Sequence, residues 1–370
     1  MTWSALQVVA CCAVTYEGAQ MQYRKLGRTG VEVSTQCLGA MMFGAVGNPD
    51  HDESQRIVHR ALDAGINFID TADMYSAGES EEIVGKALKG RRDDVVLATK
   101  FFFPLGDERN AQGGSRRYIV RAVEDSLRRL GTDRIDLYQI HRRDWDTDLE
   151  ETLDALSDLV RQGKILYAGS SSFPADQIVE AQWAAERRGG VRFVCEQPQY
   201  SIFARSIERA MLPAAQRHGM GVIPWSPLGG GWLTGKYRRD VQPPAGSRFA
   251  PSDNPAWRDR TVDVDPSAPA RYDAVERLTK IAEEAGLSLT HLALAFVGEH
   301  PAITSTIIGP KTLAQLEDLL AAAELRLDPA VLDAVDEVVP PGTDMAGINH
   351  RAGEPGLLAQ HRRRPAASAT

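Results

Sequence analysis

Cysteine is scarce in this sequence, and the few cysteines lack the spacing of a structural site. The chain of 370 residues contains four, Cys11, Cys12, Cys37 and Cys195, of which only the first two are close together. A disulfide framework needs many cysteines in a short secreted chain, and a zinc site needs ligands at short repeated spacings. We therefore expect free thiols, a reducing cytoplasmic environment and no bound metal.

The sequence also lacks a long apolar run and an excess of positive charge. No stretch of about 18 apolar residues occurs, so we expect no membrane-spanning helix. The net charge is −8 and the pI is about 5.6. The basic residues form only short, scattered clusters, which argues against a nucleic-acid surface. The expected partner is a small molecule, and a homo-oligomer stays open.

What the sequence has is a regular alternation of strand-like and helix-like segments. Eight short runs rich in β-branched and aromatic residues are typical of strands buried on both faces. These runs are 33–40, 66–70, 95–100, 135–141, 165–170, 192–197, 221–225 and 304–309. Amphipathic segments separate them; in 148–163, Leu149, Leu153 and Leu156 share one face and Gly163 is the stop. The pattern favours an α/β protein with a single (β/α)8 TIM barrel, and a doubly wound sheet is the alternative.

Several segments lie outside this repeat. Residues 1–20 are partly apolar but lack the basic flank of a signal peptide, and we expect an upstream extension with little structure. Residues 22–34 contain a glycine turn and are expected to form a hairpin over the bottom of the barrel. The stretch 227–270, rich in Gly, Pro and Ser, is expected to be a long binding loop after strand seven. The barrel then covers 21–335, followed by an irregular tail over 336–370.

Polar side chains stand at the ends of the predicted strands, where such barrels carry their chemistry. The residues at these positions are Asp70, Tyr75, Lys100, His141, Ser171, Ser172, Gln197, Trp225 and Ser226. Taken singly, Lys100 is typical of a solvated strand end and His141 of a hydrogen-bonded structural histidine. Their placement on consecutive strand ends, with a carboxylate beside them, favours a shared site.

Asp70, Lys100 and Tyr75 fit the reduction of a carbonyl group. A tyrosine hydroxyl has an ordinary pKa near ~10 and is a poor proton donor at neutral pH. A nearby ammonium lowers that pKa, and a carboxylate keeps the ammonium charged and in place. We therefore expect Asp70 to hold Lys100, Lys100 to acidify Tyr75, and Tyr75 to protonate an oxygen atom. A neutral His141 imidazole can donate a hydrogen bond to the same oxygen.

The sequence has no Rossmann fingerprint in a suitable context. The run GGGWLTG over 229–235 follows a strand, but no βαβ unit with an acidic residue follows it, so we expect a flexible loop. A better phosphate site follows strand eight, where Gly309 turns the chain into a helix whose N-terminus favours an anion. Lys311 adds a positive charge there. A plain capped helix is the alternative.

The motifs in combination resemble those of the aldo-keto reductases. The segments that carry the resemblance are GINFIDTADMYSAGESEEIVGKAL, VVLATK, IDLYQIH, GSSSF, VIPWSPLGGG and IIGPKTLAQLEDLL. The branch that fits is that of the bacterial enzymes similar to potassium-channel β subunits. The resemblance implies a (β/α)8 barrel, a catalytic tetrad of Asp70, Tyr75, Lys100 and His141, and NADPH/NADP+ in preference to NADH.

The same resemblance implies contacts to the cofactor. Ser171 and Gln197 match the positions that hold the nicotinamide carboxamide, and Trp225 matches the aromatic residue that stacks on the nicotinamide ring. Lys236 would reach the pyrophosphate. The full set of expected cofactor residues is Ser171, Ser172, Gln197, Trp225, Ser226, Pro227, Leu228, Gly230, Lys236, Gly309, Lys311, Gln315 and Asp318.

Two further features concern specificity. By the resemblance, Lys311 and Gln315 would read the adenosine 2′-phosphate, which favours NADPH. Met42 and Phe43, in the loop after the first strand, indicate an apolar and adaptable substrate mouth.

Three hypotheses for function follow. The first is an NADPH-dependent reductase of aldehydes or ketones, or the reverse oxidation of an alcohol. The second is a regulatory subunit that keeps the cofactor site and turns over slowly, as potassium-channel β subunits do. The third is a barrel isomerase or aldolase that forms a Schiff base on Lys100, which Asp70 disfavours by keeping Lys100 protonated. A metal hydrolase is weaker, because no strand end pairs histidine with a second ligand.

Overall fold

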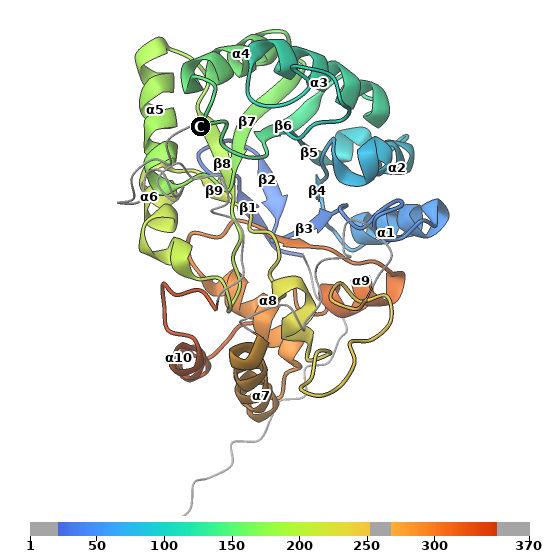
Figure 1. Cartoon of the computed structure of the whole chain (residues 1–370), viewed down its shortest axis with the longest axis vertical. Coiled ribbons are helices and arrows are strands. Elements are labelled where there is room, and N and C mark those ends of the chain that lie inside the picture. The colour runs from blue at the N-terminus through green and yellow to red at the C-terminus, as the bar shows by residue number, and fades with distance from the viewer. Residues whose placement is uncertain (1–20, 252–267, 346–370) are drawn as a thin grey trace, which may run out of the picture.

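The computed structural model describes residues 21–251 and 268–345. Its centre is a sheet of eight parallel strands in the order β10-β3-β4-β5-β6-β7-β8-β9, with helices around it (Figure 1). The strands are β3 (Gln36–Gly39), β4 (Phe68–Asp70), β5 (Val96–Phe101), β6 (Ile135–Ile140), β7 (Ile165–Ser171), β8 (Phe193–Gln197), β9 (Gly221–Val222) and β10 (Thr306–Ile308). Thr304 N donates to Val222 O at 2.8 Å and Ile307 N to Pro224 O at 3.0 Å, which joins the two edges. The predicted (β/α)8 barrel is confirmed.

The helices follow from amphipathic sequences with ordinary caps. They are α1 (His51–Asp63), α2 (Glu79–Ala87), α3 (Arg116–Leu130), α4 (Leu149–Arg161), α5 (Ala175–Arg188), α6 (Met211–His218), α7 (Ala268–Glu284), α8 (Leu289–Glu299), α9 (Leu313–Leu320) and α10 (Pro329–Val338). In α3, the Ser115 side chain caps the first turn, and Gly131 takes the left-handed conformation that ends the helix. In α4, Leu149, Leu153 and Leu156 are buried, as the periodicity predicted.

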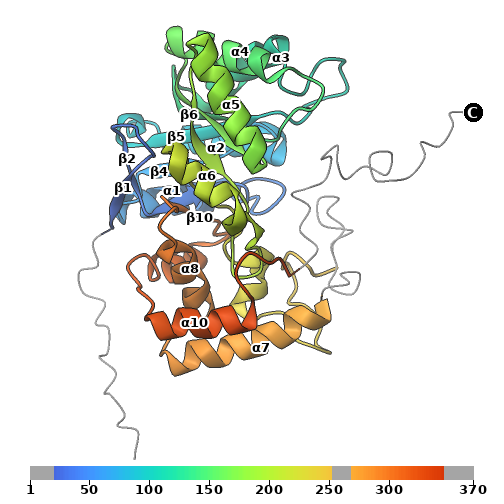
Figure 2. The same cartoon turned by 90° about the vertical axis from the view of Figure 1, so that its left-hand side faces the viewer.

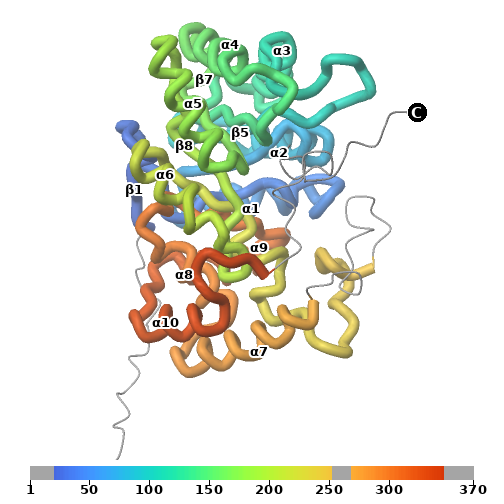
Figure 3. The backbone as a smooth tube through the Cα atoms, turned by 60° about the vertical axis from the view of Figure 1, so that its left-hand side comes forward, coloured from blue at the N-terminus to red at the C-terminus, as the bar shows by residue number. Residues whose placement is uncertain are grey.

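A hairpin closes the N-terminal end of the barrel. Strands β1 (Tyr23–Lys25) and β2 (Glu32–Ser34) pair antiparallel, and Leu26 in their turn joins the apolar cluster that fills the barrel interior. Gly27 has φ +58°, and a Cβ there would lie 2.6 Å from Gly219 O, so only glycine fits this close approach. Figures 2 and 3 show the hairpin on the opposite side of the molecule from the loop that follows β9. The predicted hairpin cap is confirmed.

The segment after β9 is more ordered than predicted. The expected loop over 227–270 contains the 3-10 turn η4 (Gly229–Thr234) and the start of α7, and its residues 252–267 lie outside the described ranges. Trp232 is fully buried, with its ring centroid 5.4 Å from that of Tyr237. Burial of large aromatic area explains why η4 is anchored to the core.

The tail also begins later than predicted. Helix α10, with Pro329 in its first turn, runs past the boundary at residue 336 and packs beside α7 (Figure 2). Beyond it, Arg205 N donates to Thr343 O at 2.9 Å and Ser206 N to Asp344 Oδ1 at 2.8 Å. The boundary at 335/336 was therefore wrong. The predictions for residues 1–20 and for the end of the tail fall outside the described residues.

Three features of the described ranges concern the kinds of protein that the sequence argued against. No helix there has the length and apolar character needed to cross a membrane. No group of three or more His, Cys, Asp and Glu side chains in those ranges is arranged to hold a metal ion. Cys37 and Cys195 are buried free thiols, and burial raises the pKa of both.

Candidate active site

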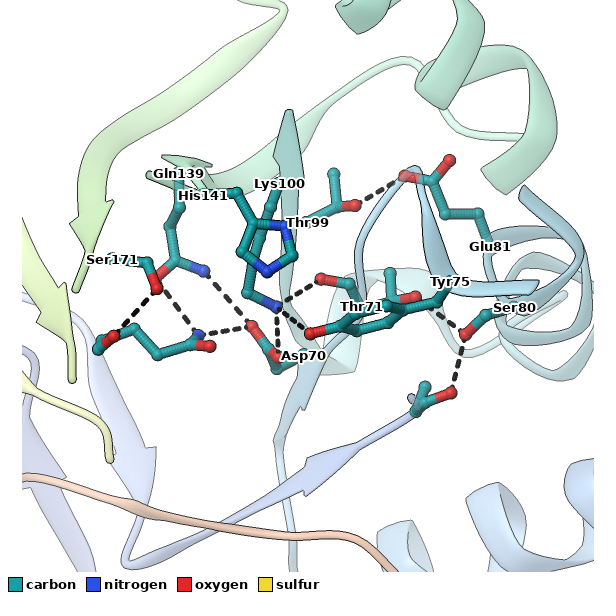
Figure 4. Close-up of polar contacts among 12 residues, drawn as sticks. Asp70, Thr71, Tyr75, Ser80, Glu81, Thr99, Lys100, Gln139, His141 and Ser171 are labelled. Carbon is teal, nitrogen blue, oxygen red and sulfur yellow. Dashed lines mark hydrogen bonds and ion pairs between the residues drawn. The ribbon is translucent and has the colours of Figure 1, made fainter. Parts of the chain in front are cut away.

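The predicted tetrad lies together at the C-terminal ends of three neighbouring strands. Asp70 ends β4, Lys100 lies near the end of β5, and His141 follows β6 directly. Tyr75 opens the 3-10 turn η1 (Tyr75–Gly78) after β4. Figure 4 shows the four side chains converging on one point. Since the strands are parallel and in register, their ends meet at one mouth, as the sequence predicted.

Lys100 is the centre of this group. Its fully buried Nζ donates to Asp70 Oδ2 at 2.6 Å, Thr71 O at 2.7 Å and Tyr75 Oη at 3.3 Å (Figure 4). Burial by itself would lower the pKa of Lys100, but Asp70 and Tyr75 outweigh it, and the net shift is upward. Lys100 therefore stays an ammonium group with three acceptors, which disfavours the Schiff-base hypothesis.

Asp70 is held by two amides as well as by the ammonium. Gln197 Nε2 donates to Asp70 Oδ1 at 2.8 Å, and Gln139 Nε2 donates to the same oxygen at 3.2 Å. Sequence reasoning missed Gln139, although β-strand alternation from Leu137 places it on the inner face of β6. Gln197 was expected to hold a carboxamide; here its amide nitrogen supports Asp70.

Tyr75 keeps its proton more firmly than predicted. Burial is the main cause that raises the pKa of Tyr75; the Lys100 charge lowers it and the Asp70 charge raises it, and the net shift is upward. Lys100 lowers the pKa of Tyr75, as predicted, but the sequence did not indicate that burial outweighs the ammonium. The hydroxyl is neutral at pH 7 and has a proton to donate.

His141 is a neutral imidazole. Its ring lies edge-on to Tyr75, with centroids 5.8 Å apart and planes at 81°. Burial, Lys100 and then Arg142 hold the pKa of His141 well below its ordinary value. Its Nδ1 atom is buried and has no hydrogen-bond partner among the described residues. A neutral imidazole of this kind can donate one hydrogen bond to a ligand oxygen.

A strained turn directs Tyr75. Ser76 and Ala77 have φ of 48° and 55°, the left-handed region that non-glycine residues rarely adopt. The Ser76 hydroxyl donates to Phe43 O at 2.9 Å and fixes the turn on the first loop. Phe43 itself is fully buried in the hydrophobic core, so its prediction as a mouth residue was wrong. Met42 is half-buried and remains at the edge.

The turn after β7 presents two predicted cofactor residues. Ser171 Oγ donates to Gln197 O at 2.9 Å, which leaves its lone pairs free to accept from a ligand amide. Ser172 has φ of 57°, and its N donates to the same carbonyl at 3.1 Å. The buried Glu196 accepts from Phe173 N at 3.1 Å and secures the turn from below. Burial raises the pKa of Glu196 to about 7.

The segment after β9 places two cations beside each other. Lys236 folds over Gly231, where a Cβ would lie 2.6 Å from Lys236 Cε. Partial removal from water and then the Arg248 charge lower the pKa of Lys236. Two neighbouring cations suit a pyrophosphate. Sequence reasoning missed Arg248, which lies on a loop without regular structure.

The remaining residues of this segment shape its backbone. Ser226 has φ of 60°, and its Oγ accepts from Gly230 N at 3.2 Å. Pro227 is buried and Leu228 packs on the core. Trp225 lies beyond the end of β9, forms an isolated bridge with Gln199 and is half-buried. A partly exposed Trp225 ring leaves a face for a flat ligand.

The segment between β10 and α9, the predicted phosphate site, has fewer free backbone amides than expected. Lys311 N already donates to Gln315 Oε1 at 2.7 Å, and Leu313 N donates to Glu53 Oε1 at 3.3 Å. Gly309 is exposed, with open space around it. The side chains of Lys311 and Gln315 are thus better candidates for an anion than the helix N-terminus itself.

Asp318 is engaged elsewhere. Its Oδ1 lies 3.1 Å from His291 Nε2 of α8. Asp318 is exposed, and its side chain links α9 to α8 instead of lying with Lys311 at the predicted phosphate site. Its prediction as a cofactor residue receives no support from this contact.

Comparison with known proteins agrees with this geometry. The aldo/keto reductase family model matches residues 36–340. An uncharacterized oxidoreductase, YrpG, from Bacillus subtilis is 40% identical over 331 residues, which is 86% of this chain and 96% of that protein. A probable voltage-gated potassium channel subunit beta from Arabidopsis thaliana is 38% identical, covering 86% and 97%. The versiconal hemiacetal acetate reductase of Aspergillus parasiticus is 34% identical, covering 86% and 96%. The chain therefore belongs to the aldo/keto reductase family of oxidoreductases.

Proposed function

We propose that the protein is an NADPH-dependent reductase of aldehydes or ketones that also runs in reverse, with Tyr75 as the proton donor. The observation that carries the proposal is the buried ammonium of Lys100, 2.6 Å from Asp70 Oδ2 and 3.3 Å from Tyr75 Oη. A protonated phenol, a neutral imidazole and a fixed cation around one mouth suit an oxygen that gains negative charge and then a proton.

The residues present fit a nicotinamide dinucleotide. Ser171 offers an acceptor for the carboxamide, Trp225 a flat apolar face, and Lys236 with Arg248 the positive charge for a pyrophosphate. Lys311 is the candidate for a 2′-phosphate. A bound reduced nicotinamide would supply the hydride.

The chain's own residues supply the proton and the positive charge. Tyr75 and His141 donate hydrogen bonds to the carbonyl oxygen and orient it. As the oxygen becomes an alkoxide, the Tyr75 proton passes to it, and Lys100 stabilises the phenolate that remains. Because Lys100 acts on the phenolate, its charge lowers the barrier even though burial keeps resting Tyr75 protonated.

The test is a panel of aldehydes and ketones, with NADPH oxidation followed by absorbance, for wild type and Tyr75→Phe. The variant should lose turnover by about 10²–10⁴-fold, the range for a general acid. It should keep its affinity for NADPH, measured by fluorescence titration. Equal turnover in the two proteins would refute the role of Tyr75.

The cofactor preference has a separate test. Lys311→Ala should weaken NADPH by about tenfold or more and NADH far less, because only NADPH carries the 2′-phosphate. Fluorescence titration of both cofactors measures the two affinities. Similar losses would mean that the 2′-phosphate is bound elsewhere.

A second candidate function is a cofactor-binding regulatory subunit with slow turnover. The resemblance to proteins named as probable channel β subunits favours it. A single burst of NADPH oxidation without steady turnover on the whole panel would support this candidate against the first.

The buried free thiols of Cys37 and Cys195 are consistent with a reducing compartment, and we propose that the protein acts in the cytoplasm.

A further inference from the structure

Arg142 lies at the mouth, beside the predicted tetrad. It follows His141 directly and is half-buried. Its Nη1 donates to His141 O at 2.7 Å and to Ser172 Oγ at 3.0 Å. Its guanidinium carbon lies 5.9 Å from the ring centroids of both Phe103 and Trp225. One end of the guanidinium is thus fixed, and aromatic rings flank it.

Arg142 has no ion pair with a described residue, whereas the buried Arg205 has two. Arg205 pairs with Glu208 at 2.9 Å and with Asp336 at 2.7 Å. Among the residues that the structure describes, no carboxylate oxygen lies within 4.0 Å of Arg142, and its Nε and Nη2 donate to none of them. Burial lowers the pKa of Arg142, whereas the pKa of Arg205 is raised, since its carboxylate partners outweigh burial. A cation removed from water without a counterion is costly unless a ligand supplies the charge.

The neighbouring acid does not fill this role. Glu196 is the carboxylate whose charge acts on Arg142. Its oxygens already accept from Ser170 Oγ at 2.5 Å and from Phe173 N at 3.1 Å. Glu196 therefore holds the turn below Ser172 and leaves the free edge of Arg142 to another group.

We propose that Arg142 binds a carboxylate of the substrate, so that the preferred substrates are carbonyl compounds with a carboxylate close to the carbonyl group. The proposal rests on the proposed function, because it names the substrate class of the same site. The Nε–Nη2 edge of a guanidinium matches a planar carboxylate with two parallel hydrogen bonds. Phe103 and Trp225 lie 5.9 Å from the guanidinium carbon and Nη1 is already engaged, so the Nε–Nη2 edge is the part left for a ligand.

The position of Arg142 suits a short substrate. Phe103 lies near both Arg142 and His141: its ring centroid is 5.9 Å from the Arg142 guanidinium carbon and 4.9 Å from the His141 ring centroid. Tyr75 contacts the same imidazole, with ring centroids 5.8 Å apart, and interacts electrostatically with Arg142. A carbonyl group at Tyr75 and a carboxylate at Arg142 are therefore close enough to belong to one small oxo acid.

The test compares each acid with its methyl ester in steady-state reduction at saturating NADPH. The pairs are 4-oxobutanoate, 2-formylbenzoate and 4-formylbenzoate with their methyl esters. Wild type should prefer at least one acid over its ester by tenfold or more in kcat/KM. Arg142→Met should reduce that acid-to-ester ratio by roughly ten- to hundredfold, the range for a hydrogen bond to a charged group. Arg142→Lys, which keeps the charge, should retain part of the preference.

A binding experiment separates this proposal from the proposed function. The same carboxylates are titrated into the NADP+ complex of each protein, and tryptophan fluorescence is followed. Arg142→Met should weaken the preferred carboxylate about tenfold or more, even if no carbonyl is turned over and the reductase proposal fails. An unchanged acid-to-ester ratio with unchanged carboxylate affinity overturns the role of Arg142 while turnover stands. A loss of NADPH affinity with an unchanged ratio also overturns it, because Arg142 would then serve the cofactor. If Arg142→Met does not fold, the acid-to-ester ratio of kcat/KM in Arg142→Lys is compared with that of wild type. The proposal is refuted if the two proteins have equal ratios for every pair and neither prefers an acid over its ester.

Discussion

Asp70 is the last residue of β4 and Asp73 follows three residues later; both are buried, but the protein stabilises them in opposite ways. Asp70 accepts from Lys100 Nζ at 2.6 Å and from Gln197 Nε2 at 2.8 Å. No Lys, Arg or His side chain of the described residues forms an ion pair with Asp73; Arg129, whose charge acts on it, pairs with Glu81. Asp73 Oδ2 accepts from the Tyr118 hydroxyl at 3.4 Å, and its Oδ1 has no partner among the described residues.

The difference follows from which side of β5 each carboxyl group faces. The inner side presents Lys100. On the outer side lies Glu81, which pairs with Arg129 at 2.7 Å. Burial, and then the Glu81 charge, raise the pKa of Asp73 to about 8. The Asp70 carboxylate holds the Lys100 ammonium that the proposed reaction requires. The Asp73 carboxyl group, on the other side of β5, is neutral at pH 7 because its pKa is raised.

The largest effect is expected from Lys100→Met, which removes the cation that distinguishes Asp70 from Asp73. It leaves Asp70 buried without its cation, so the free energy of unfolding should fall by about 3–5 kcal/mol, and turnover should be lost. Denaturant unfolding and NADPH oxidation measure the two effects. The double variant Asp70→Asn with Lys100→Met should recover stability but not turnover. A single variant as stable as wild type would contradict the view that the pair is mutually dependent.

Asp73→Asn should sharpen the comparison by removing the outer carboxyl group. The native pKa of about 8 lies above the ordinary value near ~3.9. The unfolded chain therefore loses this proton first, and the stability of the wild type declines as the pH rises from about 4 to about 8. At pH 9 the variant should gain on the order of 4 kcal/mol relative to wild type, compared with the difference at pH 5.

Denaturant unfolding at the two pH values measures this gain, and the exposed Asp107→Asn serves as the matched substitution. A constant difference between Asp73→Asn and wild type across the range would mean that Asp73 is ionised in the native protein.

Tyr118→Phe should have the smallest effect. It removes a hydrogen bond of 3.0 Å to Phe103 O and the weaker contact with Asp73. The expected loss is about 1 kcal/mol in the free energy of unfolding. Tyr167→Phe is the matched control, because the Tyr167 hydroxyl has no hydrogen bond to the described residues. An equal effect of both substitutions on the free energy of unfolding would show that the contacts of the Tyr118 hydroxyl with Phe103 and Asp73 do not stabilise the protein.

The convergence of the tetrad could be predicted because it depends on few variables. Strand ends in a parallel barrel meet at one mouth, so locating Asp70, Lys100 and His141 at strand ends was enough to bring them together. The neutral state of His141 also followed from its setting. These conclusions need the order of the strands and no side-chain detail.

The rest depended on distances that a sequence does not contain. The direction of the Tyr75 shift is a balance between burial and the Lys100 charge, and the balance is set by the packing around the phenol. Gln139 and Gln197 share one oxygen of Asp70 because of their rotamers. Arg142 follows a motif residue, but its candidacy depends on its contacts at the mouth and on the lack of an ion pair with any described residue.

Ser76 and Ala77 have a consequence for engineering. Each adopts a backbone shape that costs an L-residue roughly 1 kcal/mol, so the loop after Tyr75 is a place where the molecule gives up thermal robustness. Glycine at the solvent-facing Ala77 would recover some of it. The same substitution would increase the mobility of the loop in the absence of ligand. A more heat-resistant variant at this position would therefore hold Tyr75 less firmly in its catalytic orientation.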